Sequence, residues 1–527
     1  MPLKTLAEAS SATSRSRARN WHIAFGLLFL LAFLARIPFY ATHHIQEDAY
    51  ITFRAAFHLA DFGQYSYNLG GRASGVTSVL YGPMIAGVRL LFGVHAIAAV
   101  SVLNTLLFLA GAALLSCAWF TEWRERLLLF AGISMLPVGL MISYADMEIP
   151  LQVVLFCAAI FTLRRGRPNW ITLAAILLLP LVRPDAIAYS LILSVLVLTF
   201  NKAKGILAFG CSLAGVGLML LFNKITTGAF LTATMRAKEV AYHPDHSLHG
   251  ILNSAHFVLL AHGYLLPFES KYLDPLSALF TVVVLAGCVL ALWLARGQII
   301  TLRLLLACFA AGVLIPGAYV LGGVLFPWYF WTCTWLCFSL ACFVLVRATF
   351  AAGGRSRVFL LVALAIVWVA ADGAQWLTSR NIGLQEYHYR AGVGRWLHTV
   401  AKPTDTLELE PAGYIPFFSG LKTYDEVGLV SPLVVQYRTR YGGAWYMDFL
   451  KREHPDWLVE RANMSRHITM DGVHLSPQDT LWFDTHYTLA RHFHYSAANY
   501  LPPGLLLKLM KNGTHPDYYV YHYTANH

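Results

Sequence analysis

Two acidic residues stand at the end of the first apolar run of this 527-residue chain. Glu47 and Asp48 follow residues 22 to 40, a run whose only charge is Arg36 and whose length is about that needed to cross a bilayer. The acids therefore mark the point where the chain leaves the membrane. A carboxylate at a membrane surface, beside low-dielectric walls, is suited to take a proton from an acceptor hydroxyl while a lipid-borne substrate lies alongside.

Cations suited to a phosphate follow later in the chain. Arg183 belongs to Arg183-Pro184-Asp185, between two short apolar runs, where the proline indicates an outer loop or a break in a helix. Arginine binds phosphate as a planar bidentate donor, whereas a pair with Asp185 that only closes the turn is the alternative. Lys238 would act as a point charge. For Arg236, interfacial anchoring by snorkelling is the competing interpretation.

Glu148 and Asp146 lie between two apolar runs, where an unpaired charge is costly. They are expected to face water, a basic partner or a metal, and an ordinary polar turn is the alternative. Trp328 and Tyr329 begin another apolar run at the outer interface, where aromatic residues are membrane anchors by default. Aromatic rings also line sugar or prenyl pockets, so the pair are candidate substrate contacts.

A histidine-rich segment contains residue types that bind zinc, namely His243, Asp245, His246 and His249. The same segment contains proline and glycine and is expected to be irregular, so its spacing carries little weight. We predict no metal site there.

Composition excludes a soluble protein. Hydrophobic residues make up 57% of the chain and charged residues 13%, which indicates an integral membrane protein. The net charge of +11 would suit nucleic acid, but the basic residues cluster in short loops between apolar runs, as the positive-inside rule requires. No nucleic-acid partner is expected, and neither a Walker loop nor a dinucleotide-binding glycine loop is present.

The charge rule predicts about eleven spans, with the N-terminus inside and the C-terminus outside. Residues 1 to 21 form a cytoplasmic tail, and the outer loop 41 to 94 carries the acidic pair. Residues 77 to 93 are expected to lie in the outer interface because they contain Pro83 and Arg89. The spans are predicted at 22–40, 95–119, 127–143, 148–163, 170–182, 186–200, 206–222, 274–295, 304–324, 328–346 and 358–376.

The composition changes after residue 376. Residues 377 to 527 are more polar and contain alternating stretches such as Thr406 to Leu409, which favours a soluble α/β domain outside the membrane. The predicted fold class is an α-helical polytopic membrane protein, with its membrane module at 22 to 376 and this C-terminal domain after it.

The stretch from Glu47 to Tyr81 resembles the first periplasmic loop of bacterial polyprenyl-phosphate-sugar glycosyltransferases with the GT-C fold, similar to the mycobacterial terminal arabinofuranosyltransferase family. The shared pattern is an acidic pair, Arg54 six residues after the second acid, Asn-x-Gly-x-Arg at 68 to 72, and a small-residue turn. Those relatives usually have Asp-Asp where this chain has Glu47-Asp48. Further matches in chain order are Met147-Glu148, Arg183-Pro184-Asp185, Ala237-Lys238 and the patches 413–432 and 454–459.

The resemblance implies transfer of a sugar from a polyprenyl monophosphate to an envelope glycan or glycoconjugate on the outer face of a bacterial cytoplasmic membrane. Asp48 would be the base, with Glu47 orienting it or sharing the proton. No cofactor is required, although Asp146 and Glu148 leave room for a divalent cation, and membrane lipids are expected partners. The implied phosphate ligands are Arg183, Lys238, Arg236 and Arg54, and the implied pocket residues are Glu148, Asp185, Trp328 and Tyr329.

Two other classes of function stay open. A transporter or flippase would explain the apolar runs, but such proteins usually have two halves of similar pattern, and no internal repeat is visible here. A non-catalytic subunit of an envelope-polysaccharide assembly would not depend on the Asp48 carboxylate.

Overall fold

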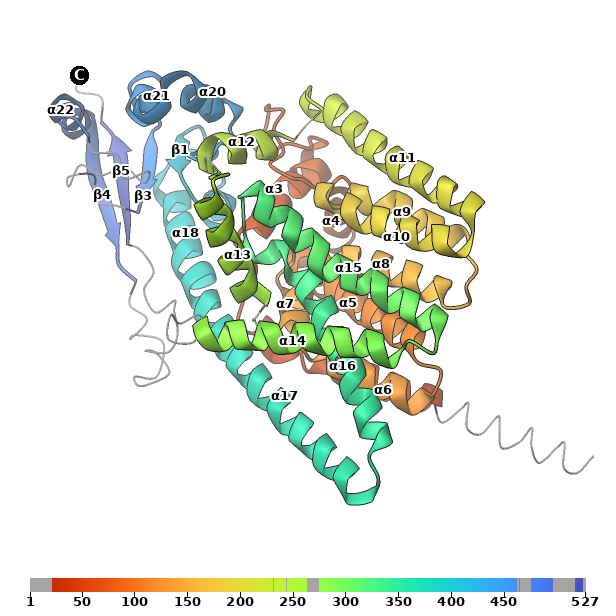
Figure 1. Ribbon diagram of the computed structural model, residues 1–527. Helices are drawn as coiled ribbons and strands as arrows, with labels where there is room; N and C mark the ends of the chain where they lie inside the picture. The colour runs from red at the N-terminus through yellow and green to blue at the C-terminus, as the bar shows by residue number, and fades with distance from the viewer. Residues whose placement is uncertain are drawn as a thin grey trace, which may run out of the picture.

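The structure is a computed structural model that describes residues 21–230, 232–242, 244–262, 274–461, 464, 475–495 and 517–524. Apolar helices gather on one side of the molecule and a sheet lies on the other (Figure 1). A long helical run, from α17 (Gly354–Gly383) to α18 (Ala391–Val400), joins the two. The helices of the membrane body are α2 Ile37–Tyr40, α3 Glu47–Phe62, α4 Tyr81–Phe92, α5 Ala96–Trp119, α6 Trp123–Ser134, α7 Pro137–Tyr144, α8 Ile149–Leu163, α9 Trp170–Val182, α10 Ile187–Phe200, α11 Lys202–Thr227, α12 Ala233–Tyr242, α13 Leu248–His262, α14 Asp274–Leu294, α15 Ile299–Gly322, α16 Trp331–Ala351 and α17 Gly354–Gly383.

The polytopic membrane body is confirmed. Among the described residues, six helices are long and apolar enough to cross a membrane, and the bent pair α6 and α7 would make a seventh. Four shorter apolar helices accompany them, at Ile149–Leu163, Trp170–Val182, Pro184–Phe200 and Ala278–Leu294. Together these segments overlap every one of the predicted spans.

The segment predicted to lie in the outer interface is α4. It continues through Gly93 into α5, and the apolar helical stretch Tyr81–Trp119 is 39 residues long. About 20 residues suffice to cross the hydrocarbon layer, so the stretch is long enough for α5 to span while α4 lies outside. Gly93, with φ 53° and ψ −122°, interrupts the regular helix at the junction.

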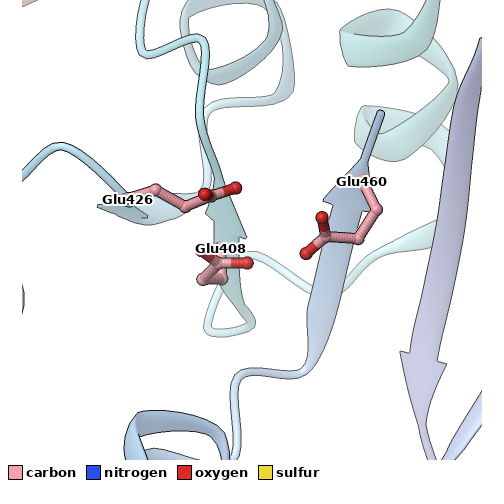
Figure 2. Close-up of side chains that lie close together, drawn as sticks. All are labelled: Glu408, Glu426 and Glu460. Carbon is pink, nitrogen blue, oxygen red and sulfur yellow. The ribbon is translucent and has the colours of Figure 1, made fainter. Parts of the chain in front are cut away.

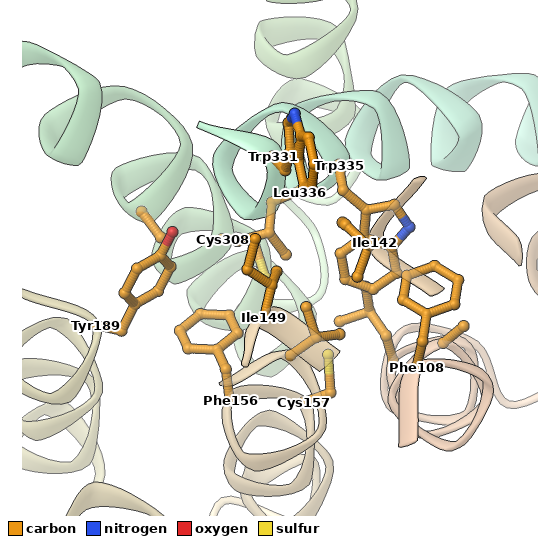
Figure 3. Packing of buried hydrophobic residues seen from close by; sticks show 14 of the residues in the cluster. Phe108, Ile142, Ile149, Phe156, Cys157, Tyr189, Cys308, Trp331, Trp335 and Leu336 are labelled. Carbon is orange, nitrogen blue, oxygen red and sulfur yellow. The ribbon is translucent and has the colours of Figure 1, made fainter. Parts of the chain in front are cut away.

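The core of the membrane body is built from interlocking aromatic and small side chains. Phe108, Phe156, Tyr189 and Trp335 are buried where α5, α8, α10 and α16 meet (Figure 3). Cys157 and Cys308 belong to the same buried cluster. Close packing of this kind holds the helix ends, and therefore the residues on the connecting loops, in fixed positions.

Arg36 occupies the bend between α6 and α7. The two helices meet at 68°, which frees backbone carbonyls that must be satisfied inside the protein. The guanidinium donates to the carbonyl of Ser134 at 2.6 Å and to Ser143 Oγ at 3.1 Å, and the residue is fully buried. Arg36, the single charge of the first apolar run, therefore stabilises the bend between α6 and α7.

The C-terminal region is a mixed α/β fold, as predicted. Its sheet has the order β2-β1-β3-β5-β4, with β1 parallel to β2 and β3, and β5 antiparallel to β3 and β4. The strands are β1 Thr406–Leu409, β2 Lys422–Asp425, β3 Trp457–Glu460, β4 Tyr487–Phe493 and β5 Tyr518–Tyr523. The helices are α18 Ala391–Val400, α19 Tyr414–Ser419, α20 Pro432–Tyr441, α21 Trp445–Glu453 and α22 Pro477–His486.

The predicted boundary at residue 376 falls inside α17. That helix continues through a π-helical segment, Leu384–Arg390, into α18 without a loop. The change of composition therefore occurs along one continuous helical run. The domain limits stay a prediction.

Candidate functional site

A cavity of about 690 Å³ opens where the helices of the membrane body meet the C-terminal region. The wall is formed by α3, the turn before α8, the corner after α9, α12, the end of α15 and the segment before α16. Leu429, which follows β2, also lines it. Of the predicted site residues, the cavity brings together Asp48, Glu148, Arg183, Asp185, Lys238, Trp328 and Tyr329.

Asp48 lies in the first turn of α3. The amide of Gln46, which precedes the helix, donates to the carbonyl of Ala145 at 3.0 Å and fixes the start of the helix beside the turn that carries Glu148. The Asp48 carboxylate is half-buried and has no hydrogen-bond or ion-pair partner within the described part of the chain. Its acceptor oxygens are therefore available to a substrate hydroxyl in the cavity.

Burial raises the pKa of Asp48 to about 6. The positive charge of Lys238 lowers this pKa, and the negative charges of Glu47, Glu148 and Glu410 raise it. A carboxyl with a pKa near neutrality is a better general base than an ordinary exposed aspartate, because it holds an abstracted proton more firmly while staying mostly ionised at pH 7.

Arg183 forms the corner after α9. Pro184 cannot continue the helix, and Arg183 takes an extended conformation with φ −150° and ψ 143°. Its Nε donates to Asp185 at 2.9 Å and its Nη1 to Glu148 at 2.6 Å. Nη2 has no hydrogen-bond partner in the described ranges, so one face of the guanidinium can still receive a phosphate oxygen. The amides of Val79 and Leu80 bind the carbonyl of Leu181 and hold the outer loop against this corner.

Lys238 reaches the same cavity from α12. Its Nζ donates to the hydroxyl of Tyr329 at 2.7 Å and lies 4.9 Å from the centre of the Phe326 ring. The Tyr329 ring stacks on Tyr319 at 4.9 Å, and Tyr319 donates to Asp185 at 2.8 Å. These contacts connect the two cations through a chain of aromatic side chains and place both charges in one hollow.

Glu148 and Asp146 belong to the same turn but point to different surroundings. Glu148 faces the cavity, whereas the Asp146 carboxylate accepts from Ser101 Oγ at 2.6 Å and is fully buried away from it. Asp146 has a φ of 57°, a left-handed conformation that aspartate tolerates better than most residues. It therefore shapes the turn that presents Glu148.

Three residues with predicted site roles lie outside the cavity. Arg54 is buried, and its guanidinium donates to the backbone carbonyls of Tyr67, Pro416 and Leu421 at 2.9, 2.6 and 2.6 Å. Arg236 is exposed on α12. Glu47 pairs with Arg390 at 3.0 Å. These placements differ from the phosphate-binding roles expected of Arg54 and Arg236 and from a direct catalytic role for Glu47.

The cavity also contains residues that the sequence did not single out for it. Tyr319 lies inside an apolar helix and Leu429 in a loop of the C-terminal region, and neither has a local signal of function. Glu239 follows Lys238, and His246 belongs to the histidine-rich segment considered for zinc. Within that segment His243 lies outside the described residues, and Asp245 binds the amide of Ser247 at 2.9 Å.

A buried acidic group lies in the C-terminal sheet. Among the described residues, carboxylate oxygens of Glu408, Glu426 and Glu460 lie within 4.8 Å of one another, a spacing that a metal ion would fit (Figure 2). The hydroxyl of Tyr446 donates to Glu460 and, at 3.3 Å, to Glu408. Burial raises the pKa of Glu460 to about 7 and that of Glu408 well above its usual value. Protons held on these carboxyls reduce the repulsion among their negative charges.

Comparisons with known proteins bear on the fold. The chain is similar to the structure of ArnT from Cupriavidus metallidurans bound to undecaprenyl phosphate, with 12% identity and a TM-score of 0.54, over 97% of this chain and 99% of that one. The chain has a GT-C-like fold.

A second similar structure with this fold is the archaeal oligosaccharyltransferase AglB from Archaeoglobus fulgidus, in complex with an inhibitory peptide and a dolichol-phosphate. That match has 12% identity and a TM-score of 0.52 over 96% of this chain and 74% of that one. Residues 380–521 match a family model described as a domain of unknown function, DUF8728. Curated proteins give no match. The GT-C-like fold thus extends over nearly the whole chain.

Proposed function

We propose that this chain is a membrane glycosyltransferase that moves one sugar from a polyprenyl monophosphate donor to a hydroxyl of a cell-envelope glycan or glycoconjugate. The site would face the outer side of the cytoplasmic membrane. Two similar structures of the same fold carry a polyprenyl-type phosphate, undecaprenyl phosphate in one and dolichol-phosphate in the other. The observation that carries the proposal is the Asp48 carboxylate, which has no partner among the residues that the structure describes, on the same cavity as Arg183 and Lys238.

Asp48 acts as the general base. The acceptor hydroxyl oxygen attacks the anomeric carbon, its proton passes to the Asp48 carboxylate, and the bond between the anomeric carbon and the phosphate oxygen breaks. The products are the glycosylated acceptor, with inverted configuration, and polyprenyl phosphate. A positioned base of this kind contributes roughly 10²- to 10⁴-fold to the rate.

Arg183 and Lys238 hold the leaving phosphate. The donor is a phosphodiester and the departing polyprenyl phosphate gains negative charge, which cations placed beforehand stabilise without reorganising. At an effective dielectric constant of about 20, a phosphate charge about 4 Å from either cation gains about 4 kcal/mol. The Glu148 and Asp185 carboxylates fix the direction of the Arg183 guanidinium and offset part of its charge.

Part of the cavity lining suits a lipid carrier. Ile187, Ile315 and Trp328 contribute apolar surface beside the phosphate-binding side of the cavity. Apolar walls accept a prenyl chain, and the aromatic ring of Trp328 can stack on a sugar. Because the phosphate arrives attached to the lipid, the reaction needs no nucleotide-binding loop.

The test is a product assay with purified protein. Polyprenyl-phosphate sugars of several kinds are supplied with envelope glycan acceptors, and the release of polyprenyl phosphate is measured. We expect release together with glycosylated acceptor from at least one such donor, and no glycosylated acceptor from the matching nucleotide sugar. Equal glycosylation of the acceptor from nucleotide sugars, or vesicle flipping of the intact donor without cleavage, would contradict the proposal.

A further inference from the structure

Glu47 precedes Asp48 and is bonded to the C-terminal region through both of its carboxylate oxygens. Its Oε1 accepts from the amides of Gly413 and Tyr414 at 2.7 and 3.1 Å, and its Oε2 lies 3.0 Å from Arg390 Nη1. The same Arg390 nitrogen lies 2.8 Å from Glu386. The side chains of Glu47, Arg390 and Glu386 are only 16, 11 and 13% exposed. An ion pair this buried is costly to break and holds its partners in one geometry.

More bonds join the outer loop to the C-terminal region near Glu47. Asn68 exchanges two hydrogen bonds with the backbone of Thr423, at 2.8 and 2.9 Å. The Tyr414 hydroxyl donates to the carbonyl of Ile45 at 2.8 Å, and Arg54 binds the carbonyls of two residues close to β2. The segment between the parallel strands β1 and β2 therefore lies against α3.

The contact is too close for larger residues. A Cβ on Gly413 would lie 2.2 Å from the carbonyl oxygen of Glu47 and 2.5 Å from its Oε1. Leu429, six residues after Thr423, continues from this contact into the cavity wall. The C-terminal region thus touches the helix that carries Asp48 and also closes part of the site.

We infer that Glu47 is a positioning residue: through Arg390 and the amides of Gly413 and Tyr414 it anchors the first turn of α3 to the C-terminal region and so fixes where Asp48 meets the acceptor. The inference rests on the proposed function for the identity of the reaction. It gives the C-terminal region a part in the catalytic geometry. Glu47 itself does not line the cavity.

Electrostatics provide a signature that a purely structural anchor lacks. The charged groups that act on Asp48 are Lys238 from α12, Glu148 from the turn before α8, Glu410 from the C-terminal region and Glu47 beside it. Glu47 raises the pKa of Asp48, so its replacement by glutamine lowers that pKa. The acidic limb of the profile of kcat/KM against pH therefore moves to lower pH.

The experiment compares Glu47→Gln, Arg390→Gln, the double variant and Arg390→Lys in the full chain. Asp61→Asn is the matched control, because Asp61 lies at the other end of α3 in an exposed ion pair with Arg89. We expect Glu47→Gln and Arg390→Gln each to lower kcat by about 10- to 100-fold, with the donor KM within about twofold. The double variant should be no worse than either single variant, Arg390→Lys should recover part of the loss, and Asp61→Asn should match the parent.

Hydrogen exchange gives a readout that needs no activity. The amides of α3 should exchange faster in Glu47→Gln than in Asp61→Asn. A parent protein that releases no polyprenyl phosphate overturns the proposed function, while faster exchange in Glu47→Gln alone still supports the anchor. An active parent whose Glu47→Gln variant keeps its kcat, pH profile and exchange rates overturns the inference. The inference is also overturned if the losses of kcat in Glu47→Gln and Arg390→Gln multiply in the double variant.

Discussion

The Glu148 carboxylate and the Arg183 guanidinium lie 2.6 Å apart, and their side chains are 6 and 8% exposed. The pair joins the turn before α8 to the corner after α9, and both residues face the cavity. Arg183 is therefore partly neutralised before any phosphate arrives. Its affinity for phosphate is set by its acidic neighbours as well as by its own charge.

Glu148→Gln should bind the product more tightly. The change removes one negative charge beside Arg183 and leaves the 2.9 Å contact with Asp185 in place. We expect the dissociation constant of polyprenyl phosphate to fall by about three- to tenfold, which corresponds to roughly 0.7 to 1.4 kcal/mol. Calorimetric titration measures it, with Glu125→Gln as the control, because Glu125 pairs with Arg347 away from the cavity. Unchanged or weaker binding would argue against phosphate at Arg183.

Lys238 and Arg236 should behave differently although they share α12. Lys238 lines the cavity, whereas Arg236 is exposed. Lys238→Ala should raise the donor KM by about 10- to 100-fold, because a charged hydrogen bond contributes roughly 1.5 to 3 kcal/mol. Arg236→Ala should stay within about twofold. Steady-state kinetics across donor concentrations check this, and equal effects of the two changes would place the phosphate elsewhere.

The stability of the C-terminal region should fall as the pH rises. Burial raises the pKa of Glu460 to about 7 and that of Asp425 to about 6, so the folded state binds more protons than the unfolded state between about pH 4 and pH 7. This contribution is fully present below the unfolded pKa values and is lost as the pH rises through the folded ones.

Thermal unfolding should therefore show a lower melting temperature at pH 8 than at pH 5, by a few degrees or more. The Glu408→Gln variant should flatten this dependence, because it removes one charge from the buried cluster. A melting temperature that rises from pH 5 to pH 8 would contradict shared protons and favour a bound cation.

The orientation of the chain can be checked by cysteine labelling from outside intact cells. Gln64 and Lys422 are exposed and should be labelled as Gln64→Cys and Lys422→Cys, whereas Lys202→Cys should be protected. Neighbouring glycines are poorer sites, because Gly63 and Gly420 have φ of 69° and 75° and a side chain there would be strained. If Lys202→Cys alone were labelled, the orientation of the chain in the membrane would be the reverse of the predicted one.

The positions of the helices could be predicted from the sequence better than the side-chain contacts between them. Apolar length and basic loops locate the helices, and Asp48, Arg183 and Lys238 stand out because charges are costly where such runs end. The partners of Glu47 were not predictable, because Arg390 lies 343 positions away and the other two donors are backbone amides. The family resemblance implied a phosphate-binding role for Arg54. In the structure, backbone carbonyls of Tyr67, Pro416 and Leu421 accept its hydrogen bonds. Such contacts could not be predicted, because a backbone carbonyl is present at every residue of a sequence.

The continuity of α17 shows a second limit. Composition changes near residue 376, but backbone hydrogen bonds do not depend on composition, so the helix continues. Tyr319 shows a third limit. It lies in an apolar helix, and only the packing of α15 against α16 brings its ring onto Tyr329.

The central claim is that the Asp48 carboxylate removes the acceptor proton. Its most direct test is the rate of polyprenyl phosphate release by Asp48→Asn at saturating donor and acceptor, measured beside Asp61→Asn on the same helix. The account predicts a loss of at least about 100-fold in Asp48→Asn, with donor binding unchanged, and no loss in Asp61→Asn. Release by Asp48→Asn at the parental rate would contradict it.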